Sequence, residues 1–312
     1  MATDNKHVTW IDCLKGIGIL SVVFAHVTDI KSVFVFSIPL FFINAGYLFH
    51  PQPFRQYFLK LSQRIAIPYC LFLLFISLFC FRSSIFEHVG DILFGGMRLG
   101  GDLGIFWFPP VLFLSLLIYN AIGIHRRPAW VMAIALPLAL GVQYINPSLP
   151  LNIQSIPLAL FYIGAGELIS SYIPKQEFVT KTLAKIKTWQ TIGIIAALCV
   201  LLWVPDIYLD IKYNDYGIPL LSILLSILAV ALVAVLSVKV SAVGTLERFL
   251  SFCGRGSLFI MFIHQFIHFR IFGNCNVWLG FVGTVTLSVG LYYIALRFAL
   301  TRRFLCGEIR KP

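Results

Sequence analysis

Long apolar runs alternate with short polar segments along nearly the whole chain. A helix needs about 20 apolar residues to cross the hydrocarbon core of a bilayer, and each run approaches that length. The pattern predicts ten spans, at residues 11–31, 34–50, 65–82, 105–124, 129–146, 155–173, 190–205, 217–238, 257–272 and 279–299. We therefore expect an all-α integral membrane protein, a bundle of about ten transmembrane helices that forms a single transmembrane domain over residues 1–312.

Composition excludes the soluble classes. Of the 312 residues 59% are hydrophobic and 12% are charged, whereas a soluble domain carries about 25% charged residues. A water-soluble fold could not cover this much apolar surface, so membrane lipids are the expected surroundings. The net charge of +11 would suggest nucleic acid in a soluble chain. Here the basic residues lie in short loops between apolar runs, so no nucleic-acid partner is expected.

The distribution of charge predicts the orientation. The segments 51–64, 174–189 and 300–312 hold many Lys and Arg, whereas 82–104 and 205–216 hold few and carry six of the thirteen Asp and Glu. Basic loops stay in the cytoplasm, so both termini are expected there. The polar N-terminus and the missing cleavage site indicate no removable signal peptide. The chain ends soon after the last run, so no appended soluble domain is expected.

Metal binding is not predicted. None of the seven cysteines forms a CxxC pair, and most lie in or beside apolar runs, where a cysteine behaves as a small hydrophobic residue. His264 and His268 have a helical i, i+4 spacing that suits a metal, but no third ligand accompanies them in the sequence.

The first apolar run contains ionisable residues at a helical spacing. Lys15 and His26 are eleven residues apart, which returns a helix to nearly the same face about 16 Å further along. Asp12 and Asp29 extend this polar stripe. Buried ionisable groups in a span are costly and usually face a wet cavity. Lys15 is then either a cation for an anionic cytoplasmic ligand or a side chain that snorkels to headgroups, and His26 is either a reactive group or a structural hydrogen-bond partner.

The same two residues belong to a wider resemblance. They match a signature of a basic residue, ten residues and a histidine. Further matches are FVFSIPLFFINAGYLF at 34–49, Arg64 with Pro68 and Tyr69, FWFP at 106–109 and GRGSLFIMFIHQFI at 254–267. In this order the segments resemble the acyltransferase 3 family, and the chain looks similar to its stand-alone sugar O-acetyltransferases, the fucose 4-O-acetylase-like branch. The second motif departs from the family pattern at Ser37, where His is common, and at Ala45, where Ser is common.

The resemblance implies an enzyme of the bacterial cytoplasmic (inner) membrane. Such proteins move an acyl group, most often acetyl from acetyl-CoA, to a hydroxyl of a cell-surface or lipid-linked glycan of the cell envelope. This chemistry needs a base for the alcohol proton, and His26 suits that role near neutral pH. Asp29 is expected to orient the imidazole. Lys15 is expected to bind the phosphates or the pantetheine of the donor, and Arg64 and Arg127 the nucleotide phosphates. The competing interpretation of these two arginines is topology charge.

Four other polar or aromatic residues are candidates for the substrate cavity. His264 matches a position of the family. Trp107 can stack on a sugar or can belong to an interfacial aromatic belt. Asn44 is either a cavity residue or a hydrogen-bonding contact between helices. Glu167 lines the cavity or pairs with a basic residue near the inner face.

Two other classes of function compete with the enzyme. One is a transporter or flippase for a sugar or a lipid-linked glycan intermediate, which would favour internal repeats with broken helices; the sequence shows no such symmetry. The other is a membrane scaffold for a glycan-synthesis complex. Acceptor-dependent loss of the thioester of acetyl-CoA would identify the enzyme, and translocation without chemistry would identify the transporter.

Overall fold

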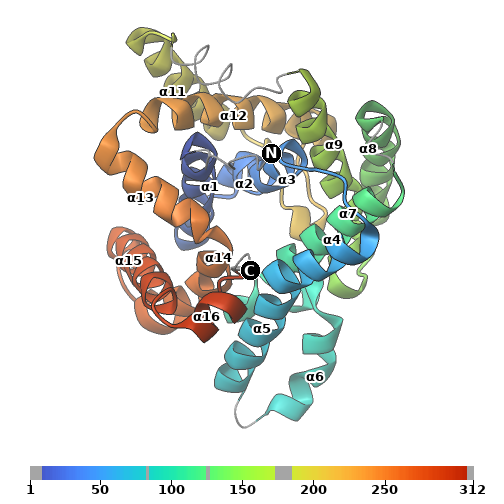
Figure 1. Ribbon diagram of the computed structural model, residues 1–312, viewed down its shortest axis with the longest axis vertical. Helices are drawn as coiled ribbons and strands as arrows, with labels where there is room; N and C mark the ends of the chain where they lie inside the picture. Colours follow the sequence, from blue (N-terminus) through green and yellow to red (C-terminus); the bar gives the residue numbers. More distant parts are fainter. Residues whose placement is uncertain (1–8, 82–83, 124–126, 173–184, 308–312) are drawn as a thin grey trace, which may run out of the picture.

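The computed structural model describes residues 9–81, 84–123, 127–172 and 185–307, and these ranges fold as a bundle of helices without β-strands (Figure 1). A single antiparallel bridge between Asp210 and Asp215 is the β-type pairing within them. The all-α prediction is confirmed for this part of the chain.

The helical elements follow one another with short connections. The α-helices are α1 (Thr9–Thr28), α2 (Phe34–Ser37), α3 (Pro39–Tyr47), α4 (Phe54–Leu61), α5 (Ile67–Cys80), α6 (Ile85–Phe94), α7 (Phe108–Ala121), α8 (Pro128–Ile145), α9 (Ile156–Tyr172), α11 (Thr188–Trp203), α12 (Pro219–Val240), α13 (Gly244–Arg255), α14 (Ser257–Ile267), α15 (Val277–Ala295) and α16 (Ala299–Phe304). Short 3₁₀ helices are η1 (Lys31–Val33), η3 (Gly96–Arg98), η4 (Gly101–Leu103), η6 (Pro150–Ser155) and η7 (Ile211–Tyr213), and π-helical turns are η2 (Ser62–Ala66) and η8 (His268–Phe272).

Proline marks where several helices begin. Pro39, Pro128 and Pro219 are the first residues of α3, α8 and α12. Proline fits the first turn because its fixed φ suits a helix and its missing N–H would have no intrahelical acceptor there. Pro137 lies inside α8, a position that membrane bundles tolerate where neighbours satisfy the freed carbonyl.

Fewer helices than the ten predicted meet strict criteria of length and apolarity for a membrane span. Seven continuous helical segments meet them, and a bent pair, Gly244–Arg255 with Ser257–Phe272, brings the total to eight. The expected spans 34–50 and 190–205 coincide with shorter apolar helices, Lys31–Tyr47 and Thr188–Trp203. The structure therefore shows a multi-pass membrane fold, while the count of ten and the cytoplasmic side of the termini stay predictions.

Large apolar side chains cover the outside of the bundle. Phe75 on α5, Trp130 on α8, Ile192 on α11 and Trp278 on α15 are all more than 60% exposed. In water such a surface would aggregate, whereas acyl chains of lipid solvate it.

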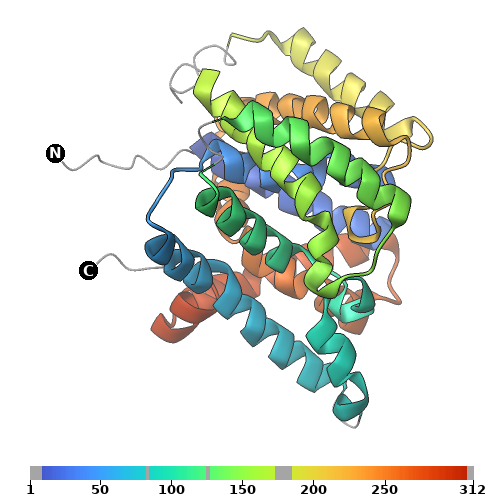
Figure 2. The ribbon, with the colours of Figure 1, turned by 90° about the vertical axis from the view of Figure 1, so that its right-hand side faces the viewer.

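Helix α1 occupies the interior and contacts α12, α13, α14 and α15 (Figures 1 and 2). Its crossing with α13 is made possible by two glycines. A Cβ on Gly16 would lie within 3.0 Å of the Leu250 carbonyl, and a Cβ on Gly254 within 3.0 Å of the Asp12 carbonyl. The absence of both side chains lets the two backbones touch, which fixes α1 against α13.

The path from α13 to α14 bends by 82°. Gly256 lies at the bend, where a Cβ would meet the ring of Tyr292 on α15. The bend turns α14 so that its last turns pack on the C-terminal end of α1, and this places His264 and Gln265 beside His26.

The connection between α11 and α12 folds back over the bundle. Its 3₁₀ helix η7 is held by η6: the Nδ2 of Asn152 donates to the Lys212 carbonyl (3.2 Å) and the hydroxyl of Ser155 donates to the Ile211 carbonyl (2.9 Å). Asn152 takes a left-handed backbone conformation (φ 63°), which asparagine tolerates better than most residues. These bonds fix the segment 207–216 as one wall of the site described next.

Candidate functional site

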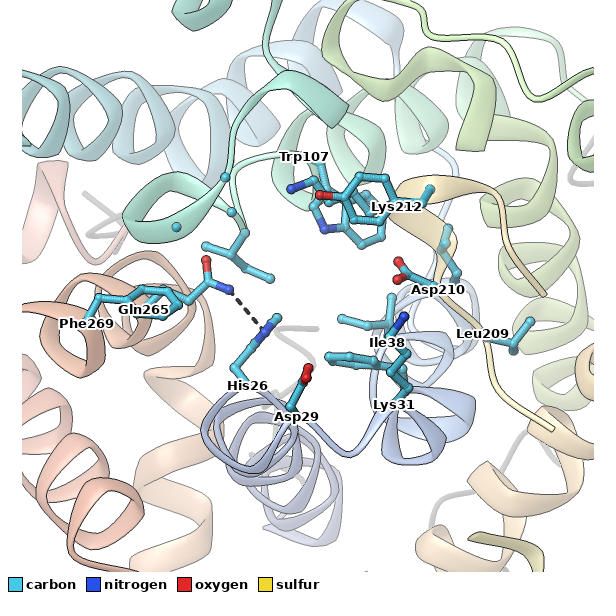
Figure 3. A pocket seen from close by; sticks show the side chains of 17 residues that line it. His26, Asp29, Lys31, Ile38, Trp107, Leu209, Asp210, Lys212, Gln265 and Phe269 are labelled. Atoms are coloured by element: carbon cyan, nitrogen blue, oxygen red, sulfur yellow. Dashed lines mark hydrogen bonds between the residues drawn. The ribbon is translucent and has the colours of Figure 1, made fainter. Parts of the chain in front are cut away.

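A polar cavity of about 300 Å³ lies at the C-terminal end of α1 (Figure 3). Its wall combines segments that are far apart in sequence: the end of α1 with η1, the η4 segment with the start of α7, the η7 segment, and α14 with η8. The lining residues are His26, Asp29, Lys31, Phe34, Ile38, Gly100, Gly101, Gly104, Ile105, Trp107, Leu209, Asp210, Ile211, Lys212, Tyr213, Gln265 and Phe269. Two of the residues predicted as catalytic, His26 and Asp29, thus lie together in this wall, and so does Trp107.

His26 is on the last turn of α1 and contacts Gln265. Its Nδ1 lies 3.1 Å from Nε2 of Gln265, the contact drawn as a dashed line in Figure 3. Its Nε2 is buried and has no hydrogen-bond partner among the described residues. One ring nitrogen of His26 is therefore held by a side chain, and the other is a buried polar atom whose hydrogen-bonding capacity is unused by the described residues.

His264 packs behind His26. The ring centroids are 5.3 Å apart, and His264 is fully buried. Its Nδ1 lies 2.8 Å from the Met261 carbonyl and 3.1 Å from the Ile260 carbonyl. Carbonyls only accept, so the proton of a neutral His264 sits on Nδ1. His264 does not line the cavity itself but supports the ring that does.

Charged residues from two connections face one another across the cavity. Asp29 and Lys31 follow α1, and Asp210 and Lys212 belong to the segment around η7 (Figure 3). Asp29 lies one residue beyond the end of α1 with φ 57°, so it leaves the helical face that Lys15 and His26 were predicted to share with it. No hydrogen bond joins Asp29 to His26 among the described residues, and the contact expected of Asp29 is made by Gln265.

Lys212 is the most buried of these charges, with 7% of its surface exposed. Its Nζ donates to the Leu99 carbonyl and lies 4.9 Å from the centre of the Tyr213 ring. Burial lowers the pKa of Lys212 from 10.5 to about 8, while the nearby Asp210 acts in the opposite direction. Burial likewise raises the pKa of Asp210 above its ordinary value. The cavity therefore contains a cation that can lose its proton near physiological pH.

An ion pair joins two of the segments that contribute to the cavity wall. Arg270 of η8 donates to both carboxylate oxygens of Asp102, at 3.1 and 2.7 Å. This fork-like geometry is the strong form of an Arg–carboxylate pair, and it ties η8 to η4. Since Gly101 and Gly104 of the η4 segment line the cavity, the pair holds this part of the wall against η8.

Lys15 lies at the other end of α1, away from the cavity. Its Nζ is 2.7 Å from Oδ1 of Asp12, one turn earlier, and about a quarter of its side chain is exposed. α1 is a continuous helix from Thr9 to Thr28, so the eleven residues to His26 correspond to about 16 Å along the axis. The two residues therefore belong to different ends of one helix, as the sequence predicts.

The other candidates lie outside the His26 cavity. Arg64 is in η2, where its backbone contacts Gly307, and Arg127 precedes α8 and borders an apolar hollow between α8 and α9. Asn44 on α3 lines a separate, apolar cavity of about 250 Å³. Glu167 on α9 accepts a hydrogen bond from the Tyr119 hydroxyl.

Four charged or amide lining residues were not candidates from the sequence: Lys31, Asp210, Lys212 and Gln265. Gln265 gave a usable signal, since it is a polar residue inside an apolar run and directly follows His264. Lys212 and Lys31 gave none, because a lysine in a connection is ordinarily solvated. Within the described ranges, no group of three or more His, Cys, Asp or Glu side chains is arranged to hold a metal ion.

Comparison with known proteins gives one match. A family model described as an acyltransferase domain, that of acyltransferase 3, matches residues 8–296. No curated protein and no solved structure matches the chain. The matched residues run from the start of α1 to the end of α15 and include every lining residue of the His26 cavity.

Proposed function

Because the chain belongs to the acyltransferase 3 family over nearly its whole length, we propose that it is a membrane-embedded O-acyltransferase. It moves an acetyl group from cytoplasmic acetyl-CoA to a hydroxyl of a cell-surface or lipid-linked glycan in the bacterial cytoplasmic membrane. The observation that carries this proposal is the position of His26: an imidazole with one held and one unpartnered nitrogen in the wall of a polar cavity inside an apolar bundle.

The reaction assigns one task to His26. It takes the proton of the acceptor hydroxyl as that oxygen attacks the thioester carbonyl. The new C–O bond forms, the C–S bond breaks, and the departing sulfur of CoA receives the proton back from the imidazolium.

The charged residues of the wall suit a carbohydrate acceptor. Asp29 and Asp210 accept hydrogen bonds from sugar hydroxyls, and Lys31 and Lys212 donate them. The indole of Trp107 also lies in the wall, almost wholly buried. The ammonium of Lys212 also supplies positive charge for the oxyanion that develops on the thioester carbonyl.

The size of the cavity limits what it holds. About 300 Å³ is at the lower end of the range of small-molecule sites, enough for a sugar unit or for the acetyl-thioester end but not for a whole CoA. The nucleotide therefore stays outside, towards the end of α1 that carries Lys15. Lys15 binds a phosphate or the pantetheine there, and Arg64 and Arg127 are the further donor-binding candidates from the sequence.

The test uses purified protein in lipid vesicles with labelled acetyl-CoA and a panel of glycans. The wild-type protein should consume the thioester only in the presence of an acceptor. His26→Ala should lower the rate by at least about 100-fold while leaving expression and thermal unfolding unchanged. His50→Ala is the matched control, because His50 is exposed after α3.

Two results would contradict the proposal. Wild-type rates in His26→Ala would show that the base is another group. Passage of the glycan across the vesicle membrane without loss of the thioester would identify a transporter instead.

A further inference from the structure

Gln265 occupies a confined position between His26 and the η4 segment. It is 5% exposed, and its Nε2 lies 3.1 Å from Nδ1 of His26. On the other side its Oε1 lies 2.8 Å from the point that a Cβ of Gly104 would occupy. A side chain at 104 would therefore displace this amide, and the glycine leaves it in contact with the histidine.

The orientation of the amide decides which nitrogen of His26 carries the proton. As drawn in Figure 3, the amide N–H donates to Nδ1, so the proton of the neutral ring is on Nε2. In that state Nε2 of His26 already carries a proton. Nδ1 can take one only by losing the hydrogen bond that it accepts from Gln265. With the amide turned by 180°, Oε1 accepts from Nδ1–H, and the lone pair is on Nε2, which has no partner among the described residues.

The surroundings of the amide favour the turned orientation. As drawn, Oε1 is buried without a hydrogen-bond partner among the described residues. The Gly101 carbonyl oxygen lies 3.2 Å from the same Cβ point of Gly104, so two acceptor oxygens face the same small space. Turning the amide gives Oε1 the Nδ1–H of His26 as its donor and so removes a buried acceptor that has no donor.

On this basis we propose that Gln265 is a positioning residue that sets the tautomer of His26: its Oε1 holds the proton on Nδ1 and thereby keeps Nε2 as the basic nitrogen. The inference rests on the proposed function. When Nε2 takes the acceptor proton, the imidazolium keeps its Nδ1–H bond to Gln265, so the positive charge formed during the reaction stays hydrogen-bonded. A neutral amide performs this task without adding a charge to the membrane interior.

Other titratable groups lie near His26, some in the cavity wall and some behind it. They are His264 on α14, His268 on η8, Lys212 on η7 and Asp29 at the end of α1. None of them makes a hydrogen bond to the imidazole within the described ranges, so the contact with Gln265 is the one that can be varied without removing a charge.

The experiment compares three proteins by the pH dependence of kcat in the vesicle assay. Gln265→Leu removes the acceptor at similar size and should lower kcat by about 10- to 100-fold, with the KM values for acetyl-CoA and glycan nearly unchanged. Gln265→Glu keeps an oxygen at Nδ1 and should retain most of the activity at its own optimum. Its carboxylate favours the imidazolium, so the acidic limb of its profile should move to higher pH by about one unit or more.

A fourth variant reaches the same contact indirectly. Gly104→Ala introduces a Cβ 2.8 Å from Oε1 of Gln265, so the amide must shift, and kcat should fall as in Gln265→Leu. Gly141→Ala on α8 is the matched control, since a Cβ there meets nothing within 4 Å, and it should leave kcat unchanged.

The outcomes separate this inference from the proposed function. If the wild-type protein shows no acceptor-dependent loss of the thioester, the proposed function is wrong. If the wild type is active and Gln265→Leu keeps its kcat and pH profile, the positioning role is wrong. The role is also wrong if Gln265→Glu is as inactive as Gln265→Leu at every pH, because a merely structural amide would show no rescue by an acceptor.

Discussion

Replacing Lys212 by methionine tests whether the buried ammonium acts in the reaction. Methionine has a similar length but carries neither charge nor donor, so Lys212→Met removes the cation from the cavity wall and leaves its volume nearly filled. We expect a lower rate at pH 7 and, in addition, a change in how the rate depends on pH.

The size of the effect follows from the environment of Lys212. With its pKa lowered to about 8, the fraction in the ammonium form falls from about nine-tenths at pH 7 to about one-tenth at pH 9. The wild-type rate should therefore fall roughly ninefold over this interval. The lost activity should return on lowering the pH, because the change is a titration.

Stability should change in the opposite direction. The folded pKa, about 8, is lower than the ordinary value of 10.5, so between these values the unfolded chain binds more protons and stability rises with pH. Loss of the proton from Lys212 relieves a cost of burying its charge that is on the order of 3 kcal/mol. A rate that falls while the midpoint of thermal unfolding stays constant or rises cannot be attributed to denaturation.

The assay is the initial rate of acceptor-dependent thioester loss from pH 6 to pH 10, corrected for hydrolysis without protein. Lys185→Met is the matched control, because Lys185 is exposed on the surface, and its profile should equal that of the wild type. If Lys212→Met still shows the decline near pH 8, another group titrates there and the assignment to Lys212 is refuted.

Three further substitutions test other parts of the account. Lys15→Ala should raise the KM for acetyl-CoA about tenfold, which corresponds to a loss of about 1.4 kcal/mol of binding free energy, and should change the KM for glycan little. Equal changes in both KM values would refute a donor-side role. Gly254→Ala should destabilise the fold by about 1–3 kcal/mol in thermal or denaturant unfolding, because its Cβ meets the Asp12 carbonyl, and an unchanged midpoint would contradict the close crossing. Tyr119→Phe removes the hydroxyl that donates to Glu167 and should cost about 1–3 kcal/mol by the same measurement; no loss would show that this bond contributes little.

The helices themselves were predictable because hydrophobicity determines them directly. Seven of the expected spans overlap segments long and apolar enough to cross a membrane, although the span expected at 65–82 begins eleven residues after its segment, Phe54–Cys80. The short helices were harder, since a run such as 190–205 is apolar throughout but gives a helix of only 16 residues, Thr188–Trp203. The 82° bend at Gly256 also gave no periodic signal, because the amphipathic α13 lacks a long apolar run.

The site was predictable in part, since His26, Asp29 and Trp107 were candidates from the sequence and all three line the cavity. Helical geometry alone links Lys15 and His26, and the structure shows both on α1. Asp29 escaped the same reasoning because α1 ends at Thr28 and the next residue adopts a left-handed conformation. Gln265 and Lys212 approach His26 through tertiary packing, which a single sequence does not encode in any local pattern.

The attachment of the η7 segment has a consequence for the evolution of substrate choice. Asn152 and Ser155 bind this segment through its main-chain carbonyls, at Ile211 and Lys212. Main-chain oxygens are present whatever side chains the segment carries, so its sequence can diverge while its path is preserved. Related enzymes could thus acquire new acceptors by exchanging a stretch of about ten residues, without any alteration to the histidine that performs the chemistry.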